Sequence, residues 1–319
     1  MAQDPPVLVT GGSGVVGRGV VARLAAEGRA VRAPSHPECD VLDVDALCRA
    51  MDGCEVAYHV AGVNQFCLRD PSPMQRVNVE GSTNVVEAAA RTGLRRLVYT
   101  SSAAALGEVA GTVGREDSPH RGSFLSAYER SKHDAERAVL AAAADRGVEV
   151  VCVSPSSVQG PGRASGTGKV LIAYLRGRLK FWIDTTVSLV DIDDCAEGHL
   201  LAEAKGAAGE RYVLNAASLG SDEMLAMMAR VAPGVRPPRI APPSLVRCGV
   251  AVAAAVARAR GRTPVVCGEA LRTLQHGHRY DGSRACRDLG LQYRPAEETV
   301  RRTAEWLVAE GLAPPSALR

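Results

Sequence analysis

Near its N-terminus the chain reads Val7-Leu8-Val9-Thr10-Gly11-Gly12-Ser13-Gly14-Val15-Val16-Gly17. The apolar run predicts a strand buried on both faces of a parallel sheet, and the glycines that follow it contain the pattern G-x-G-x-x-G. Glycine permits a tight turn, close approach of the backbone to a pyrophosphate, and packing of the next helix on the strand. The start of that helix offers free N–H groups and a positive dipole end. We therefore expect a dinucleotide-binding turn that contacts its ligand through Gly11, Ser13, Gly14, Val15, Val16 and Gly17.

Short apolar strands alternate with longer, alanine-rich helical segments in the first half of the chain. The expected strands are 7–10, 31–33, 56–60, 96–101 and 148–153, and the expected helices are 14–27, 45–51, 79–92 and 127–146. This succession implies right-handed crossovers. It predicts an α/β fold, a Rossmann-type doubly wound parallel sheet.

Glycine and proline cluster in 156–168, and proline again in 233–243, so the second half has a different character. Helices are expected at 224–230, 245–259, 268–274 and 297–309, without regular strand partners. Segments 189–191 and 211–214 are short and apolar enough to return to the first sheet. The predicted division is a dinucleotide-binding domain at 1–154, joined by 188–215, and a smaller, mostly helical substrate lobe at 155–187 and 216–319.

Composition excludes several classes of partner. The 319 residues are 46% hydrophobic and 23% charged, with a net charge of +3, which favours a globular protein that binds neither nucleic acid nor a membrane. Aromatic residues are only 4%, too few for stacking on single-stranded nucleic acid. Nine scattered cysteines, no C-x-x-C pair and no signal-peptide pattern predict a cytoplasmic protein whose thiols stay reduced.

The end of the second strand bears on cofactor choice. An acidic residue is expected there to bind the adenosine ribose of NAD, but the sequence has none between Val31 and Glu38. Arg18, Arg32, Ser35 and His36 are candidates for a 2′-phosphate. NADP is therefore favoured, with NAD as the alternative.

One tyrosine stands a helical turn before a lysine. Tyr128 and Lys132 are four residues apart on one helix face, and a nearby cation favours a phenolate that can exchange a proton with a substrate oxygen. With seven tyrosines and four lysines, a chance pair at this spacing is expected only about 0.09 times. Hydroxyls of Ser101 and Ser102 follow an expected strand, at the sheet edge where ligands bind.

With these residues in view, the chain resembles the extended short-chain dehydrogenase/reductase superfamily, and more closely its NAD-dependent epimerase/dehydratase branch. Its dihydroflavonol-4-reductase-like and hopanoid-associated sugar-epimerase-like members are the most similar. The resemblance spans nearly the whole chain and rests on the motifs TGGSGVVG (10–17), HVAG (59–62), NVEGSTN (78–84), TSS (100–102), Tyr128…Lys132, PSSVQGPG (155–162), LVDIDD (189–194) and GERY (209–212).

The resemblance implies a role for each matching residue. Tyr128 would be the acid/base, Lys132 would lower its pKa and hold the nicotinamide ribose, and Ser102 would hydrogen-bond the reacting oxygen. Asn78 would be a structural bridge or part of a proton relay. The remaining cofactor contacts would be Asp40 and Val41 at the adenine, Val60, Ala61 and Gly62 at the ribose and phosphates, and Pro155, Ser156 and Val158 near the nicotinamide.

The sequence departs from this family where substrates bind. Many nucleotide-sugar enzymes have Arg-Pro at the fifth strand and Tyr in the motif after it, whereas this chain has Ser154-Pro155 and Gln159. Family members often pair through two long helices, here 79–92 and 127–146. A homodimer is one expectation, and two helices that simply cover the sheet are the other.

Other polar groups receive structural interpretations. His276 and His278 suggest a metal, but no third ligand has suitable spacing nearby, so a solvated helix end is expected. Asp191, Asp193 and Asp194 are expected to cap a helix at the surface. Arg176 and Arg178 suit either an anionic substrate or a surface helix face, and Phe66 suits either a pocket wall or the core.

The preferred hypothesis is an NAD(P)-dependent oxidoreductase that moves hydride between nicotinamide and a carbonyl or secondary alcohol of a small molecule, with Ser102, Tyr128 and Lys132 as catalytic residues and no metal. The alternative is a nucleotide-sugar epimerase or dehydratase with tightly bound NAD. A third hypothesis, an idle dinucleotide sensor or scaffold, conflicts with the intact Ser–Tyr–Lys set.

Overall fold

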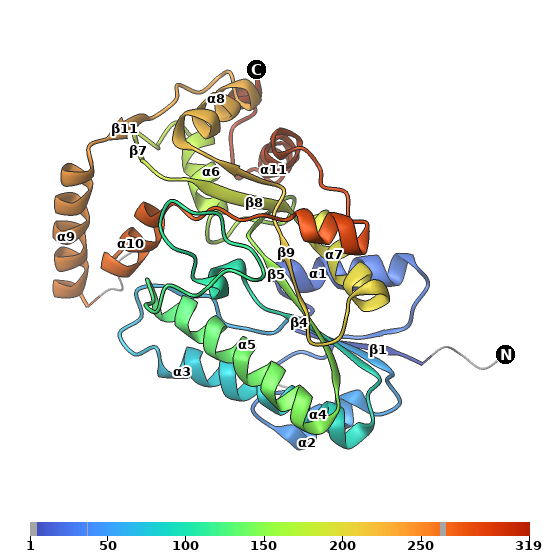
Figure 1. Cartoon of the computed structure of the whole chain (residues 1–319). Helices are drawn as coiled ribbons and strands as arrows, with labels where there is room; N and C mark the ends of the chain where they lie inside the picture. Colours follow the sequence, from blue (N-terminus) through green and yellow to red (C-terminus); the bar gives the residue numbers. More distant parts are fainter. Residues whose placement is uncertain (1–4, 37, 262–265) are drawn as a thin grey trace.

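The computed structural model describes residues 5–36, 38–261 and 266–319, with a doubly wound parallel sheet at its centre (Figure 1). Six strands run in the order β2-β1-β3-β4-β5-β9, and every neighbouring pair is parallel. Their bounds are β1 Val7–Thr10, β2 Val31–Arg32, β3 Val56–His59, β4 Arg96–Thr100, β5 Glu149–Pro155 and β9 Arg211–Leu214. The predicted fold class is confirmed. Strand β2 is only two residues long, as the short 31–33 segment predicts.

Helices cover both faces of this sheet because successive strand residues point to opposite sides. Val7 and Val9 enter the core under α1 and α7, whereas Leu8 enters the core under α2, α4 and α5. The helices are α1 Val15–Ala26, α2 Val44–Met51, α3 Ser72–Gln75, α4 Gly81–Thr92, α5 Ala127–Arg146 and α7 Ile192–Lys205, with a π-helical turn η1 at Arg76–Glu80 and a 3₁₀ turn η2 at Ala103–Leu106. The helix expected at 79–92 is present, but its first two residues belong to η1 and α4 begins at Gly81.

Most of the remaining elements surround a second core, whereas η3 (Ala285–Leu289) packs against α7 and against β9 of the central sheet. The helices among these elements are α6 Gly168–Leu175, α8 Ser221–Val231, α9 Pro243–Ala259, α10 Gly268–His276 and α11 Ala296–Ala309, with the short turns η3 and η4 Pro315–Leu318. Tyr174, Trp182 and Leu307 are among the residues that fill the second core. No helix among the described residues is long and apolar enough to cross a membrane.

Two small sheets lie outside the central one. Strands β10 (Ala217–Leu219), β8 (Val187–Asp191) and β6 (Ser157–Gln159) form one, and β11 (Arg239–Ala241) pairs with β7 (Phe181–Ile183) in the other. Segment 211–214 joins the central sheet as expected. The expectation for 189–191 was wrong, because β8 pairs with β6 and β10 instead.

Candidate active site

The glycine turn brings the start of α1 to the carboxyl edge of the sheet. A Cβ atom on Gly11 would lie 2.6 Å from the Cα of Ala61, and one on Gly17 would lie 2.1 Å from the Gly11 carbonyl oxygen. Gly14 caps α1 without a side-chain hydrogen bond, and the first turn contains no acid. Its first N–H groups are therefore free of intrahelical partners and can receive an anion. This donor set fits a dinucleotide pyrophosphate.

The residues after β2 show which candidates remain for the adenosine ribose. Arg32 donates to the carbonyl oxygens of Ala50 (2.6 Å) and Asp52 (2.8 Å), at the end of α2. One guanidinium nitrogen of Arg32 is thus held by those carbonyls, and its contact with a 2′-phosphate stays a prediction. The backbone N–H and hydroxyl of Ser35 both donate to the carboxylate of Glu38. These hydrogen bonds hold the pKa of Glu38 below its usual range.

The predicted adenine-flanking residues lie just beyond. His36 is largely exposed, with its Nε2 4.0 Å from the Asp40 carboxylate. That carboxylate accepts from the backbone N–H of Leu42. Val41 is buried, and its carbonyl oxygen accepts from Asn84 of α4. This hydrogen bond therefore joins the segment before α2 to α4.

Val60, Ala61 and Gly62 follow the end of β3 and run beside the glycine turn. The N–H of Val60 donates to the Thr10 carbonyl oxygen, which continues the pairing of β1 with β3. A Cβ atom on Gly62 would lie 3.8 Å from Lys132 Nζ. The segment therefore connects the expected phosphate end of the site to the Tyr–Lys helix.

Ser102, Tyr128 and Lys132 come from two elements. Ser102 follows β4 in extended conformation and caps η2, its hydroxyl accepting from the Ala104 N–H at 3.3 Å. Helix α5 begins at Ala127 because the hydroxyl of Ser126 accepts from the Glu129 N–H. Tyr128 and Lys132 therefore lie in the first turns of α5, beside the carboxyl end of β4.

Burial shifts the pKa values of both members of this pair. Burial raises the pKa of Tyr128, while a hydrogen bond with Ser102 and the charge of Arg163 lower it. Burial also lowers the pKa of Lys132 to about 8. Its ammonium donates to the Thr100 carbonyl oxygen at 2.8 Å. The role of Lys132 in lowering the Tyr128 pKa stays a prediction.

Asn78 links three parts of the site. Its amide nitrogen donates to the Val63 carbonyl oxygen (2.9 Å) and to the Ser131 hydroxyl (2.8 Å), and its amide oxygen accepts from the Val63 N–H. It lies in the π-helical turn η1. Ser131 in turn donates to the Tyr128 carbonyl oxygen. These contacts make Asn78 a bridge between the loop after β3 and α5.

The predicted nicotinamide contacts follow β5. Pro155 ends that strand, and the Ser156 N–H donates to the Leu214 carbonyl oxygen. The Ser156 hydroxyl is buried without a partner in the described part of the chain. Val158 is buried in β6. The orphaned hydroxyl is a donor that fits the carboxamide of a nicotinamide.

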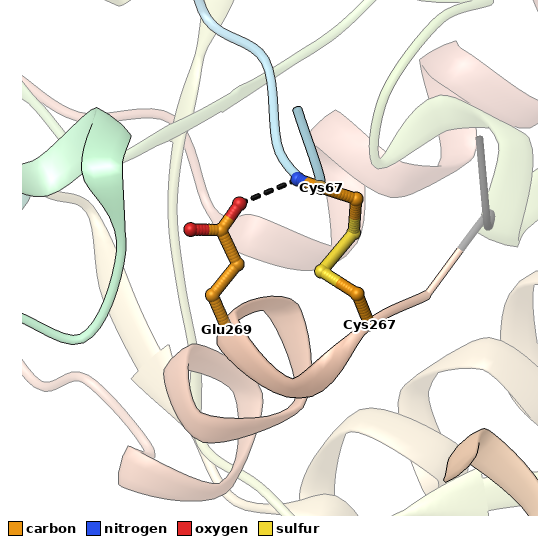
Figure 2. Close-up of side chains that lie close together, drawn as sticks. All are labelled: Cys67, Cys267 and Glu269. Atoms are coloured by element: carbon orange, nitrogen blue, oxygen red, sulfur yellow. Dashed lines mark hydrogen bonds between the residues drawn. A yellow bond between two sulfur atoms is a disulfide. The ribbon is translucent and has the colours of Figure 1, made fainter. Parts of the chain in front are cut away.

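Two cysteines join the lobes beside this site, which corrects the expectation that all nine remain thiols. Cys67 and Cys267, 200 residues apart, form a disulfide with a Cα–Cα distance of 5.7 Å (Figure 2). Next to Cys67, the ring of Phe66 lies 5.8 Å from that of Tyr128. This contact favours the pocket-wall interpretation of Phe66. The disulfide therefore ties a segment that borders Tyr128 to the start of α10.

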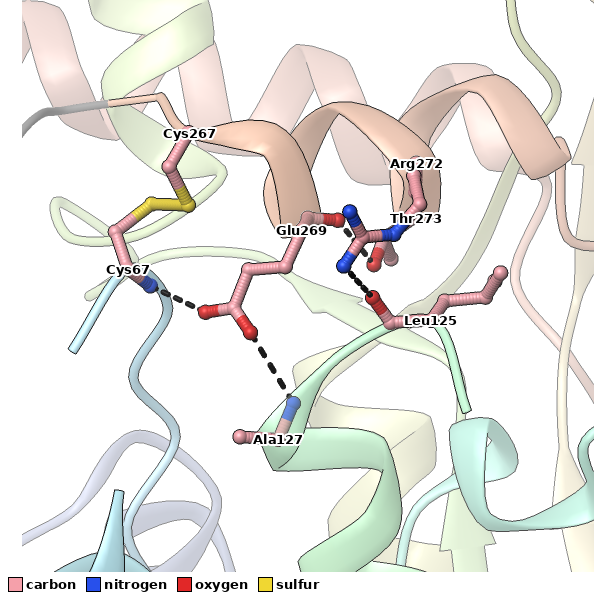
Figure 3. Close-up of a disulfide and its surroundings, with 7 residues drawn as sticks. All are labelled: Cys67, Leu125, Ala127, Cys267, Glu269, Arg272 and Thr273. Atoms are coloured by element: carbon pink, nitrogen blue, oxygen red, sulfur yellow. Dashed lines mark hydrogen bonds between the residues drawn. A yellow bond between two sulfur atoms is a disulfide. The ribbon is translucent and has the colours of Figure 1, made fainter. Parts of the chain in front are cut away.

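Glu269 reinforces that connection from the first turn of α10. Its carboxylate accepts from the Cys67 N–H and from the Ala127 N–H at 3.2 Å (Figure 3). Arg272, one turn later, donates to the Leu125 carbonyl oxygen. The loop after β3, the start of α5 and α10 therefore meet at one carboxylate.

A second connection corrects the interpretation of His276 and His278 as a solvated helix end. Nδ1 of His278 lies 2.6 Å from the Glu108 carboxylate, and Nε2 of His276 lies 3.4 Å from it. Burial and the neighbouring His278 lower the pKa of His276, while the charge of Glu108 opposes them. Glu108 comes from the loop after η2 and is buried, so the fold supplies the third group that sequence spacing did not.

Asp191 ends β8 and caps α7, as expected, whereas Asp193 and Asp194 lie in the first turn of that helix. Asp191 is fully buried. Its carboxylate accepts from the Asp193 N–H and pairs with Arg294 (2.9 Å) and Arg302 (3.1 Å). The expectation of a solvated surface group was wrong for Asp191, because α11 and the segment before it bring two guanidinium groups against the start of α7.

Sequence reasoning missed Arg163, Tyr280, Glu108 and Glu269 as neighbours of this site. Arg163 acts on the pKa of Tyr128 from the glycine-rich segment after β6. Tyr280 is buried, and the charges of Glu108 and Tyr128 both act on its pKa. The position of Arg163 among glycines was the only sequence feature that could have indicated such a role. Nothing in the sequence around Tyr280, Glu108 or Glu269 places them near this site.

Comparisons with known proteins agree with this geometry. The family model described as "NAD dependent epimerase/dehydratase family" matches residues 7–215. A protein described as a dihydroflavonol 4-reductase in Synechocystis sp. is 32% identical, over 95% of this chain and 94% of its own length. Sterol demethylase protein B of Methylococcus capsulatus is 30% identical, over 96% and 99%. The crystal structure of gox2253 superposes with a TM-score of 0.83 at 29% identity, covering 97% of this chain and 100% of that one.

The family match covers the glycine turn, the Ser102, Tyr128 and Lys132 positions and the strands that carry them, and the two relatives align over almost their whole length. The chain is therefore an enzyme that belongs to the NAD-dependent epimerase/dehydratase family of the extended short-chain dehydrogenase/reductase superfamily, whose members use NAD(P) in oxidoreductase and epimerase reactions.

Proposed function

We propose that this protein is an NADP(H)-linked oxidoreductase that interconverts a carbonyl and a secondary alcohol on a small, largely apolar molecule. The convergence of Ser102 and the first turns of α5 at one sheet edge, next to an uncapped helix start, carries the proposal. The cofactor supplies the hydride when bound, and the chain supplies position and proton transfer.

Four residues supply the positioning and the proton transfer. In the direction of reduction, the Tyr128 hydroxyl donates its proton to the carbonyl oxygen, and the Ser102 hydroxyl hydrogen-bonds the same oxygen and holds it in place. Lys132, fixed by the Thr100 carbonyl oxygen, presents its ammonium to the cofactor ribose. Asn78 keeps α5 in register with the loop after β3.

Two observations favour a reductase over a nucleotide-sugar epimerase, which is the second candidate function because the family model includes it. The two curated relatives described above are named as a dihydroflavonol 4-reductase and a sterol demethylase protein. In addition, Gln159 stands where many sugar-nucleotide enzymes have tyrosine. Its amide donates to Ser157 and Thr167 within the chain, and is therefore occupied.

The cofactor preference is the more specific part of the proposal. The groups proposed to meet a 2′-phosphate are Arg18, Arg32, His36 and the Ser35 hydroxyl and N–H, although Arg32 also binds the end of α2. Ser35 now binds Glu38, and a phosphate would replace that carboxylate. We expect kcat/KM to favour NADPH over NADH, and Glu38→Gln to increase the preference. A preference for NADH that Glu38→Gln weakens would instead assign Glu38 to the ribose of NAD.

A substrate panel tests the reaction itself. Aromatic and polycyclic ketones and nucleotide sugars are each incubated with NADPH and with NADH, and the purified protein is denatured to identify any retained cofactor. Turnover of ketones with exchangeable NADPH supports the proposal. Stoichiometric retained NAD with sugar-nucleotide turnover would assign the epimerase reaction instead.

The same proposal covers location and organisation. We infer that residues 1–154 with 188–215 bind the cofactor, and that 155–187 with 216–319 shape the substrate pocket. The protein would work in the cytoplasm, where the nicotinamide cofactor pool is held, as a monomer or as a homodimer through α4 and α5. Light scattering distinguishes these two states.

A further inference from the structure

Helix α9 exposes an apolar stripe. The side chains of Leu245, Val252 and Val256 are 67%, 64% and 42% exposed. They lie 7 and 11 residues apart, so they share one helix face. Figure 1 shows α9 at the edge of the molecule, beside α10. Its opposite side carries the buried Ala254, so the exposed face is the one turned away from the lobe.

The strand pair that leads into α9 adds an exposed aromatic ring. Phe181 of β7 is 64% exposed. Ile240 of β11, 41% exposed, pairs with Trp182 and therefore points to the opposite face of the strand pair. Arg239 is the register partner of Phe181, which places cation and ring side by side along the pair. Five of the ten large apolar side chains exposed in the described residues lie on β7, β11 and α9, so the exposed apolar surface is concentrated there.

Basic residues dominate this region, although Asp184 directly follows β7 and Arg230 pairs with Glu297 of α11. Between Glu223 and Glu269 the sequence contains seven arginines and no acidic residue. In the described ranges, no carboxylate pairs with the exposed side chains of Arg236, Arg239 or Arg260. The whole-chain charge of +3, from which no membrane partner was predicted, therefore conceals a strongly cationic segment.

A hollow beside the β7–β11 strand pair is also lined by basic residues. Its volume is about 470 Å³, and its wall includes Phe181 and the cations Arg176, Lys180, Arg236 and Arg239, with no acidic residue. Four cations around one hollow beside an exposed aromatic ring match the chemistry of a phosphate headgroup at the edge of an apolar layer.

We propose that β7, β11 and α9 form a docking face for an anionic phospholipid membrane. The apolar stripe and Phe181 enter the boundary between headgroups and acyl chains, while the arginines bind lipid phosphates. A second copy of the chain fits this face poorly, because a twofold contact would place the same uncompensated arginines opposite one another. The proposal concerns a surface and does not rest on the proposed reaction.

Vesicle co-sedimentation of the full chain tests the proposal. Phosphatidylcholine vesicles containing about 30% phosphatidylglycerol should bind the protein at about 0.05 M salt, and binding should fall steeply by about 0.5 M. Pure phosphatidylcholine should bind at least about tenfold more weakly. Val252→Asp should weaken binding to anionic vesicles at least about tenfold, and Arg236→Ala with Arg239→Ala about 20-fold, at about fivefold per arginine.

Matched variants separate this face from the rest of the surface. Val113→Asp alters another exposed valine, and Arg91→Ala with Arg95→Ala removes the same charge from α4 and the turn after it. Both should bind vesicles like the unmodified protein, and thermal melts check that every variant is folded. Equal binding to both lipid mixtures, or no binding at low salt, would overturn the proposal. A dimer in sedimentation velocity that Val252→Asp dissociates would assign the face to self-association.

Discussion

The two sides of the site are held together by different means. On one side, Ser102 follows β4, and Tyr128 and Lys132 lie on α5, both of which are packed through continuous apolar cores on the faces of the sheet. On the other side, α10 reaches the site through individual contacts, namely the Cys67–Cys267 disulfide, the Glu269 carboxylate and the Glu108–histidine cluster. The first side can lose a polar group and keep its shape. The second depends on a few individual contacts.

The largest expected effect is a loss of turnover, without a loss of cofactor binding, on removal of the Tyr128 hydroxyl. Tyr128→Phe removes the proton donor, so kcat should fall about 10²- to 10⁴-fold. Cofactor affinity, measured by fluorescence titration, should be unchanged, because the ring remains in place. Unaltered turnover would exclude Tyr128 as the acid/base.

The disulfide should show the opposite behaviour, a loss of stability on the side formed by α10. Cys67→Ser opens a loop of 200 residues and should lower the free energy of unfolding by about 2–4 kcal/mol in urea titrations. Cys267→Ser should have the same effect, and the double variant should add nothing. Cys286→Ser, at an exposed free thiol, is the matched control. Equal free energies of unfolding for Cys67→Ser and the control would show that the disulfide does not stabilise the fold.

Lys132→Met should sharpen the contrast, because it removes activity while raising stability. Burial lowers the pKa of Lys132 from 10.5 to about 8. Below pH 8 both folded and unfolded chains hold the proton, and the full cost of burying the ammonium is present. Between pH 8 and 10.5 only the unfolded chain holds it, so stability of the unmodified protein rises with pH. The variant should gain on the order of 1–3 kcal/mol at pH 7, and this gain should shrink toward pH 10.

Calorimetric melts at pH 7 and 10 measure that difference. Lys169→Met, at an exposed lysine of α6, is the control and should leave both melts unchanged. A variant that is less stable than the unmodified protein at pH 7 would mean that the Thr100 hydrogen bond outweighs the burial cost.

The smallest effect should arise at the Glu108 cluster. Glu108→Gln keeps the shape of the side chain but removes the carboxylate that receives His278, which should cost about 1–2 kcal/mol. Thermal melts of this variant beside Glu310→Gln, which alters an exposed side chain, provide the measurement. Indistinguishable melts would show that the imidazoles find other partners.

The sequence predicts the side formed by the glycine turn and α5 better than the side formed by α10. The glycine turn and the Tyr128–Lys132 spacing are local along the chain, so pattern and helix geometry suffice to predict them. Glu108 and His278 lie 170 residues apart, and nothing in either segment indicates the other. Strand 189–191 was assigned to the wrong sheet because an apolar run predicts a strand without identifying its neighbour. The hydrogen bonds of Arg32 to the α2 carbonyls were not predicted, because they depend on where β2 ends.

The Cys67–Cys267 bond also makes the chain a covalent ring with two tails. The ring contains Ser102, Tyr128, Lys132 and the glycine-rich segment 160–168, whereas the glycine turn lies in the N-terminal tail and α11 in the C-terminal tail. A protease that cuts once within 160–168 would therefore leave two pieces that migrate as one species in electrophoresis until a reductant separates them. A single gel of the cut protein, run with and without reductant, therefore shows whether the Cys67–Cys267 disulfide is formed.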